Sequence, residues 1–126
     1  MLKNILLIDD SDKITSLLKL FLFDAGNIGT IHSANQLQDA EEMIALKIMD
    51  LVILDIQFEK GNGMKLLKRI KLYYPATTVI VLTNHSDDFF KELSEQAGAD
   101  HFLDKSEEFE KIPGIISQLS FKALIQ

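Results

Sequence analysis

The chain contains no cysteine and no tryptophan, and only two prolines among its 126 residues. Without cysteine, a disulfide framework, a thiolate nucleophile and a cysteine-based zinc site are all excluded. No apolar run approaches the roughly 20 residues that a membrane-spanning helix needs, and the apolar stretch at the N-terminus is too short for a signal peptide. We therefore expect a cytoplasmic protein that does not enter a membrane.

Positive charge is also scarce. Thirteen Lys and Arg residues stand against nineteen Asp and Glu residues, which gives a formal net charge of −6. Proteins that grip a phosphate backbone need a basic face, so direct binding of nucleic acid is not expected. The length and the 47% hydrophobic content predict one domain, residues 1–126, with its own core.

Short apolar runs alternate with segments of helical periodicity five times along the chain. All-apolar runs of this length are typical of parallel strands that are buried on both faces, and the pattern predicts an α/β, doubly wound (βα)5 fold. We expect strands at 4–9, 28–32, 51–54, 78–82 and 100–104, and helices at 12–25, 35–48, 63–73, 87–97 and 110–124. Gly29 lies within the second run, where it weakens a strand, so an edge position is predicted for that strand.

Several residues mark the helix ends. Ser11, Asn35 and Ser86 are predicted N-caps of the first, second and fourth helices. Pro113 belongs in the first turn of the last helix, where its missing N–H group costs little, so that helix should not begin much before residue 109.

Five polar residues lie where the predicted strands end: Asp9, Asp10, Asp55, Thr83 and Lys105. Ligands of open parallel α/β sheets bind outside the carboxyl ends of the strands, so these side chains should share one site. Three clustered carboxylates raise one another's pKa unless a cation joins them, and a set of oxygen ligands suits Mg²⁺. A metal held by acids, with a lysine and a threonine opposite, predicts a site for a phosphoryl group.

These residues belong to a longer set of motifs. The set comprises Leu7-Ile8-Asp9-Asp10-Ser11, Asp55 with Gly63 eight residues on, Leu82-Thr83, Gly98-Ala99-Asp100 and Lys105. With these motifs in this order, the chain resembles the receiver domain of two-component response regulators over essentially its full length. The resemblance implies a five-stranded parallel sheet of order 2-1-3-4-5, as in flavodoxin-like and CheY-like folds.

The resemblance also implies a role for each site residue. It makes Asp55 the phosphoacceptor for a sensor histidine kinase or a histidine phosphotransfer protein, with slow autodephosphorylation and no other catalysis. The implied ligands of Mg²⁺ (or Mn²⁺) are Asp9, Asp10, Asp55 and the backbone carbonyl of Gln57. Thr83 and Lys105 would contact the phosphoryl group, Thr83 and Phe102 would form the conformational switch, and Gln57 and His85 would tune the phosphoryl lifetime.

Some positions depart from the family pattern. Phe58-Glu59 stand where Met-Pro is common, and Asn84 stands where a small residue is favoured. Ser106 replaces the usual proline after the lysine, so a cis bond is not expected there. These departures leave open a receiver-like binding module that works without phosphorylation. A flavin carrier of similar fold is disfavoured, because the acidic loop 9–12 would repel a phosphate.

Simpler interpretations of the same residues also remain open. A strand-ending Asp55 could only cap a loop, Asp9-Asp10-Ser11 could be an ordinary helix start, and Phe102 could be a core aromatic. Lys105 could be a surface lysine at the end of a strand, and His85 an exposed loop residue.

The first and last helices carry more apolar residues than one buried face needs. The predicted core stripe of the first helix is Ile14, Leu17, Leu18, Phe21 and Ala25, and Phe23 lies about opposite this stripe. On the last helix Phe121, Leu124 and Ile125 point away from the predicted core side. These four outward residues predict a patch for self-association or for docking an effector domain, although scattered exposed apolar side chains are also common.

Overall fold

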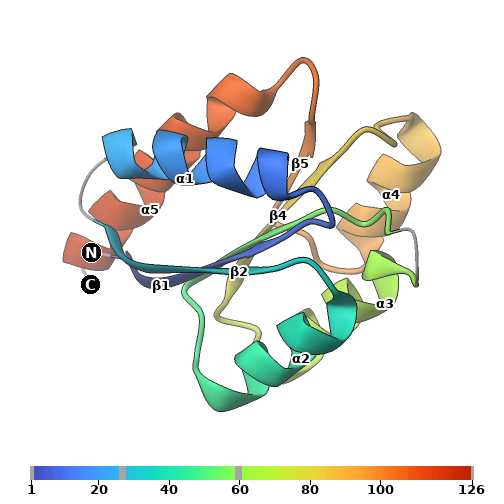
Figure 1. The fold of residues 1–126 in the computed structure, drawn as a ribbon, viewed down its shortest axis with the longest axis horizontal. Helices are drawn as coiled ribbons and strands as arrows, with labels where there is room; N and C mark the ends of the chain where they lie inside the picture. Colours follow the sequence, from blue (N-terminus) through green and yellow to red (C-terminus); the bar gives the residue numbers. More distant parts are fainter. Residues whose placement is uncertain (1, 26–27, 59–60, 126) are drawn as a thin grey trace.

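The computed structural model describes residues 2–25, 28–58 and 61–125, in which strands and helices alternate (Figure 1). The elements are β1 (Leu2–Ile8), α1 (Asp12–Ala25), β2 (Ile28–Ala34), α2 (Leu37–Leu46), β3 (Leu51–Leu54), α3 (Gly63–Tyr73), β4 (Thr78–Thr83), α4 (Asp88–Gln96), β5 (His101–Asp104), a short 3₁₀ helix (Phe109–Lys111) and α5 (Ile112–Ile125). None of the described helices is long and apolar enough to cross a membrane.

The five strands form one parallel sheet of order β2-β1-β3-β4-β5. This confirms the predicted fold class and strand order. Figure 1 shows α1 and α5 on one face of the sheet, and α2 and α3 on the other. Helices α1, α2, α3 and α4 each follow one strand and return the chain to the amino end of the next, so the strands point the same way and their carboxyl ends share one edge.

Two apolar clusters hold these layers together, one on each face of the sheet. Leu6 and Ile8 of β1 belong to the cluster that α2 and α3 cover, and Ile5 and Leu7 belong to the cluster that α1 and α5 cover. All four side chains are at most 1% exposed. Successive strand residues point to opposite faces, so burial on both faces explains why the strands are continuous apolar runs rather than alternating ones.

The edge position of β2 is confirmed, since it pairs only with β1 in the described sheet. The glycine within this strand has a packing reason. A Cβ at Gly29 would lie 2.4 Å from the carbonyl oxygen of Lys3 in β1. Glycine within a strand often marks a place where another backbone approaches closely, as β1 does here.

Two predictions about helix ends are confirmed. Ser11 Oγ accepts a hydrogen bond from the backbone N–H of Ile14 at 3.3 Å and so caps α1. Pro113 is the second residue of α5, which begins at Ile112. There its missing N–H group breaks no helical hydrogen bond.

Two other predicted N-caps are wrong. Helix α2 begins at Leu37 with Gln36 at the N-cap and no side-chain cap bond, so Asn35 does not cap it. Helix α4 is capped by Asp87, whose carboxylate accepts from Phe90 N at 3.0 Å. Because Asp87 takes the cap one residue later than predicted, the hydroxyl of Ser86 is free to bind elsewhere, and it donates to the carboxylate of Asp104.

Candidate functional site

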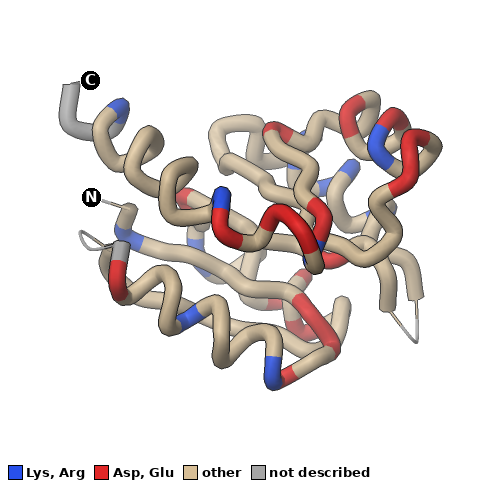
Figure 2. The backbone as a smooth tube through the Cα atoms, turned by 90° about the horizontal axis from the view of Figure 1, so that it is seen from above, with Lys and Arg blue, Asp and Glu red and all other residues tan. Residues whose placement is uncertain are grey.

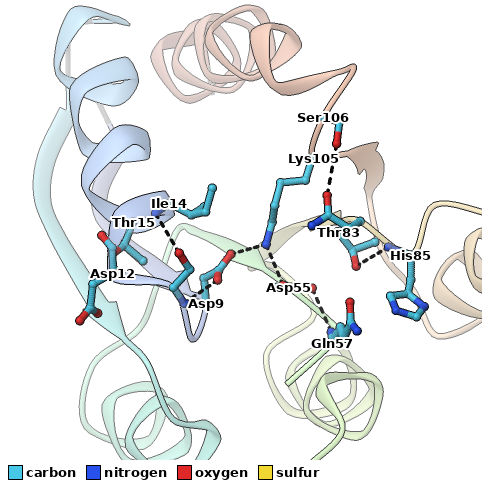
Figure 3. A network of polar contacts seen from close by, with 12 residues as sticks. Asp9, Asp12, Ile14, Thr15, Asp55, Gln57, Thr83, His85, Lys105 and Ser106 are labelled. Atoms are coloured by element: carbon cyan, nitrogen blue, oxygen red, sulfur yellow. Dashed lines mark hydrogen bonds and ion pairs between the residues drawn. The ribbon is translucent and has the colours of Figure 1, made fainter. Parts of the chain in front are cut away.

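The parallel sheet brings the predicted site residues to one edge. Asp9 directly follows β1, Asp55 follows β3, Thr83 ends β4 and Lys105 follows β5. Asp9 is 3% exposed and Asp55 5% exposed. Figure 3 shows the Lys105 side chain reaching between the two carboxylates. The site predicted at the strand ends is therefore a single cluster in the structure.

The ammonium of Lys105 bridges the two buried carboxylates. Its Nζ lies 2.7 Å from Asp9 Oδ2 and 2.8 Å from Asp55 Oδ2, and the lysine side chain is only 10% exposed. The sequence predicted that Lys105 shares one site with these carboxylates, but not that its ammonium would contact both of them. Hydrogen bonds between ionised partners are among the strongest in proteins, so this bridge fixes the relative positions of β1, β3 and β5 at the site.

Each carboxylate uses its other oxygen to hold its own loop. Asp9 Oδ1 accepts from the backbone N–H of Ser11, and Asp55 Oδ1 accepts from that of Gln57, both at 2.9 Å. Both side chains are thereby held from two directions, and neither is free to change rotamer without breaking a charged hydrogen bond.

Burial and charge shift the ionisation of the bridge. Burial, the largest influence, raises the pKa of Asp9 above its usual value, while the hydrogen bonds from Lys105 and Ser11 partly oppose the rise. Burial alone would lower the pKa of Lys105, but its hydrogen bonds to Asp55 and Asp9 outweigh this and raise the pKa. The lysine is thus held in its charged form by its two partners.

A cavity of about 470 Å³ opens above the bridge. Its lining includes Asp9, Asp10, Asp55, Gln57, Asn84 and Lys105. One oxygen from each of the carboxylates of Asp9, Asp10 and Asp55 can be chosen so that all three lie within 4.8 Å of one another. Carboxylate oxygens without nitrogen or sulfur are the ligands of a hard cation such as Mg²⁺, so this donor set fits the predicted metal.

Gly63 lets α3 start close against this site. A Cβ at this position would lie 2.7 Å from the carbonyl oxygen of Asp55 and 2.7 Å from Cα of Ile56. The Gly63 N–H donates to the carbonyl of Ile56 at 3.0 Å, and Asn62 caps the helix by accepting from Met64 N at 2.8 Å. The glycine eight residues after Asp55 therefore has a steric role next to the candidate phosphoacceptor.

The two candidate switch residues, Thr83 and Phe102, are not among the residues that line the cavity. Thr83 is fully buried, and its Oγ1 accepts from the backbone N–H of His85 at 3.1 Å (Figure 3). A hydroxyl that accepts one bond still has its own hydrogen to donate. Phe102 is partly buried and packs against the cluster on the α2 and α3 face of the sheet.

The remaining candidate residues surround these groups. Gln57 and His85 are exposed, and the His85 ring meets the ring of Phe90 edge to face with centroids 5.3 Å apart. Among the described residues no peptide bond is cis, as expected with Ser106 after Lys105. Glu59 lies outside the described residues.

The predicted partner surface is only partly described. Phe23 is 82% exposed and Phe121 63% exposed, as predicted. Leu17 was expected in the core stripe but is 42% exposed, because α1 buries a narrower face centred on Leu18 and Leu22. The side chains of Ala25, Leu124 and Ile125 lie outside the described part of the structure.

Comparison with known proteins decides the family. The family model of the response regulator receiver domain matches residues 5–117. The chain belongs to this family. Magnesium and phosphorylation are typical of receiver domains, and the relatives described next are bacterial.

Two curated relatives illustrate the match. The transcriptional regulatory protein CpxR of Klebsiella pneumoniae subsp. pneumoniae is 36% identical over 107 residues, which cover 82% of this chain and 43% of CpxR. The Fimbriae Z protein of Salmonella typhimurium is 26% identical over 92% of this chain and 55% of its own length. The chain thus spans about half the length of these relatives.

Solved receiver structures share the whole fold. The signal receiver domain of a DNA-binding response regulator from Colwellia psychrerythraea superposes with a TM-score of 0.85 at 25% identity, covering 93% of this chain and 97% of that domain. The beryllofluoride-activated NtrC4 receiver domain, solved as a dimer, superposes with a TM-score of 0.81 at 28% identity, covering 95% and 97%.

The bridge predicts a pH-dependent effect of removing its cation. Lys105→Met removes two interactions that lower the pKa of Asp9, so that pKa should rise further in the variant. A carboxyl group whose pKa is higher in the folded than in the unfolded chain makes folding less favourable at a pH above its folded-state pKa. This penalty disappears as the pH falls below its unfolded-state pKa.

We therefore expect Lys105→Met to lower the free energy of unfolding by about 2 kcal/mol at pH 7, and by less at pH 5. Urea unfolding at both pH values, without divalent cations, measures the difference. The exposed Lys19→Met on α1 is the control and should show little change at either pH. A deficit in Lys105→Met that is equal at pH 5 and pH 7 would contradict the account.

Proposed function

We propose that this receiver domain is a phosphorylation-controlled signalling switch whose phosphoacceptor is Asp55. The observation that carries the proposal is the Lys105 bridge, which places a fixed ammonium 2.8 Å from one oxygen of a buried carboxylate at the base of an acid-lined cavity. The proposed donor is the phosphohistidine of a sensor histidine kinase or of a histidine phosphotransfer protein. Membership of the family supports this choice.

The proposed reaction transfers one phosphoryl group. An oxygen of Asp55 attacks the phosphorus, an O–P bond forms, and the P–N bond to the donor imidazole breaks, so that the imidazole leaves with the bonding electrons and takes up a proton. Lys105 lies beside the attacking carboxylate and would balance the negative charge of the incoming phosphoryl oxygens. Mg²⁺ held by Asp9, Asp10, Asp55 and the Gln57 carbonyl would supply further charge neutralisation.

Thr83 and Phe102 are the proposed switch. The Thr83 hydroxyl can donate a hydrogen bond to a phosphoryl oxygen once Asp55 is modified, and this would draw the start of the β4–α4 loop towards the site. Phe102 packs on the face of the sheet that α2 and α3 cover. Its ring would move into the space that Thr83 leaves. The output is then a shift between two conformations that both exist beforehand.

Gln57 and His85 are proposed to set the lifetime of the acyl phosphate. Both are exposed, two residues beyond Asp55 and Thr83 respectively, where they can orient or exclude the water that hydrolyses the O–P bond. Slow autodephosphorylation of this kind is the only further catalysis we propose.

The alternative is a receiver-like binding module that does not depend on phosphorylation. One observation favours it. Asn84 lines the cavity, and its Oδ1 accepts from Ser106 Oγ at 3.4 Å, so a polar side chain stands where access to Asp55 is needed. The complete set of acids, threonine and lysine favours the switch instead.

The partners proposed beyond the kinase follow from the relatives. CpxR is a transcriptional regulator and is longer than this chain, so an effector domain is a candidate partner, as is a second copy of the chain. Figure 2 shows acidic and basic positions interspersed along the backbone rather than one basic face, so we propose no direct contact with nucleic acid. We also propose a cytoplasmic location, where kinases present their phosphohistidine, and no contact with a membrane.

Intact mass spectrometry after incubation with phosphoramidate and Mg²⁺ tests the switch. The parent should gain one phosphate, while Asp55→Ala, and the parent without Mg²⁺, should gain none. In the same assay Gln57→Ala should gain the phosphate and lose it at a different rate. A parent that stays unmodified, with its fold intact and the donor active on another receiver domain, would favour the phosphorylation-independent module.

Exposed Phe23 and Phe121 make the first and last helices the proposed partner surface, together with Leu124 and Ile125, whose side chains are not described. If this surface mediates self-association, a Phe23→Glu, Phe121→Glu double variant should sediment as a monomer at concentrations where the parent is larger. Identical sedimentation of the two proteins at all concentrations would exclude self-association through this surface.

A further inference from the structure

We propose that Asp104 is a positioning residue, which fixes Lys105 in the site by tying the loop that carries the lysine to the loop that follows Thr83. This inference rests on the proposed function, because it assigns Asp104 a part in the same phosphoryl site. Asp104 is the last residue of β5 and precedes Lys105 directly.

One oxygen of Asp104 holds the turn that carries Lys105. Asp104 Oδ1 accepts from the backbone N–H groups of Ser106 and Glu107, both at 2.8 Å. The backbone of Asp104 is fixed as well, since its N–H donates to Glu108 Oε1 at 3.0 Å and its carbonyl accepts from Glu108 N at 2.9 Å. The turn after β5 is therefore closed by four hydrogen bonds that all involve one residue.

The other oxygen of Asp104 reaches the neighbouring loop. Ser86 Oγ, between β4 and α4, donates to Asp104 Oδ2. Asp104 and Thr83 are paired in the register of β4 and β5, and Lys105 N donates to the Thr83 carbonyl at 3.0 Å. The hydrogen bond from Ser86 to Asp104 therefore joins the two loops just beyond the last paired residues of β4 and β5. The contact between Ser106 and Asn84 joins the same two loops a second time.

The ionisation of the Asp104 carboxylate strengthens the hydrogen bonds that it accepts. The hydrogen bond from Ser86, followed by those from the backbone of Glu107 and Ser106, holds the pKa of Asp104 below its usual value. The side chain is therefore an ionised acceptor near neutral pH, and hydrogen bonds to charged groups are stronger than those between neutral groups.

The lysine needs such a support because its own side chain is flexible. Lysine carries several freely rotating bonds, and Ser106 follows it where a proline would stiffen the chain. Lys105 must nevertheless meet two carboxylate oxygens at 2.7 and 2.8 Å. A backbone that is fixed at residue 104 limits the positions from which the ammonium can start, and small displacements of a positioned group are costly to a reaction rate.

The test compares two substitutions that remove the same charge. In Asp104→Asn the amide oxygen can still accept from the two backbone N–H groups, and the amide nitrogen can donate to Ser86 Oγ. Asp104→Ala removes all three bonds. Glu107→Ala, in the same turn, is the control for losing an exposed acid there. With phosphoramidate and Mg²⁺ we expect Asp104→Ala to be phosphorylated about tenfold more slowly than the parent, whereas Asp104→Asn and Glu107→Ala should stay within about twofold.

A second readout distinguishes positioning from general damage. A loosened Lys105 competes less well for the carboxylates, so Asp104→Ala should bind Mg²⁺ about threefold more tightly than Asp104→Asn, although damage to the fold would weaken binding. In a Lys105→Met background the two Asp104 variants should bind Mg²⁺ equally, since there is no ammonium left to position. Calorimetric titration of the four proteins with MgCl₂ measures both effects.

Equal phosphorylation rates in Asp104→Ala and Asp104→Asn would overturn the inference, as would a Mg²⁺ difference that persists without Lys105. If the parent itself gains no phosphate, the proposed function fails, while the Mg²⁺ titrations still decide whether Asp104 positions Lys105. If Asp104→Ala does not fold, Ser86→Ala takes its place. This substitution should spare the fold, because Asp87 rather than Ser86 caps α4 and the bonds from Ser106 and Glu107 to Asp104 remain. Ser86→Ala should then bind Mg²⁺ more tightly than the parent, and only when Lys105 is present.

Discussion

The contact on which the rest of the site depends is the ammonium of Lys105 between two buried carboxylates. Asp9 and Asp55 follow strands that lie side by side in the sheet, and burial alone would make two neighbouring anions costly there. Lys105 offsets this cost with contacts of 2.7 and 2.8 Å. In the proposed reaction the same contact allows Asp55, a carboxylate held beside a fixed cation, to accept a further negative group.

Three carboxylates at this edge of the sheet use their two oxygens for different partners. Asp9, Asp55 and Asp104 each give one oxygen to a backbone N–H of their own loop and the other to a residue on a neighbouring element. Each carboxylate therefore closes a local turn and joins two parts of the chain that are distant in sequence. A change of charge at Asp55 would directly disturb the contacts of one of these three carboxylates.

The fold and the main site could be predicted from the sequence because their signals are local and strong. Buried parallel strands require unbroken apolar runs, and the residues that end those runs must share one edge, so Asp9, Asp55, Thr83 and Lys105 were found together. The prediction was wrong where several polar residues compete for one position. Asn35 and Ser86 were expected to cap helices, but Gln36 and Asp87 occupy the cap positions, and only the packed loops decide between neighbours that have similar chemistry. The link from Ser86 to Asp104 could not be predicted, because it depends on where two loops meet in space.

The most direct test of the central claim is the ¹⁹F NMR spectrum of the protein with Mg²⁺ and beryllofluoride, a mimic of a phosphoryl group on a carboxylate. Asp55 lies beside a fixed ammonium and belongs to a set of three carboxylates that suits Mg²⁺. We therefore predict bound fluorine resonances that require Mg²⁺ and are lost in Asp55→Ala. A folded protein that shows only free beryllofluoride species at saturating Mg²⁺ would contradict this claim.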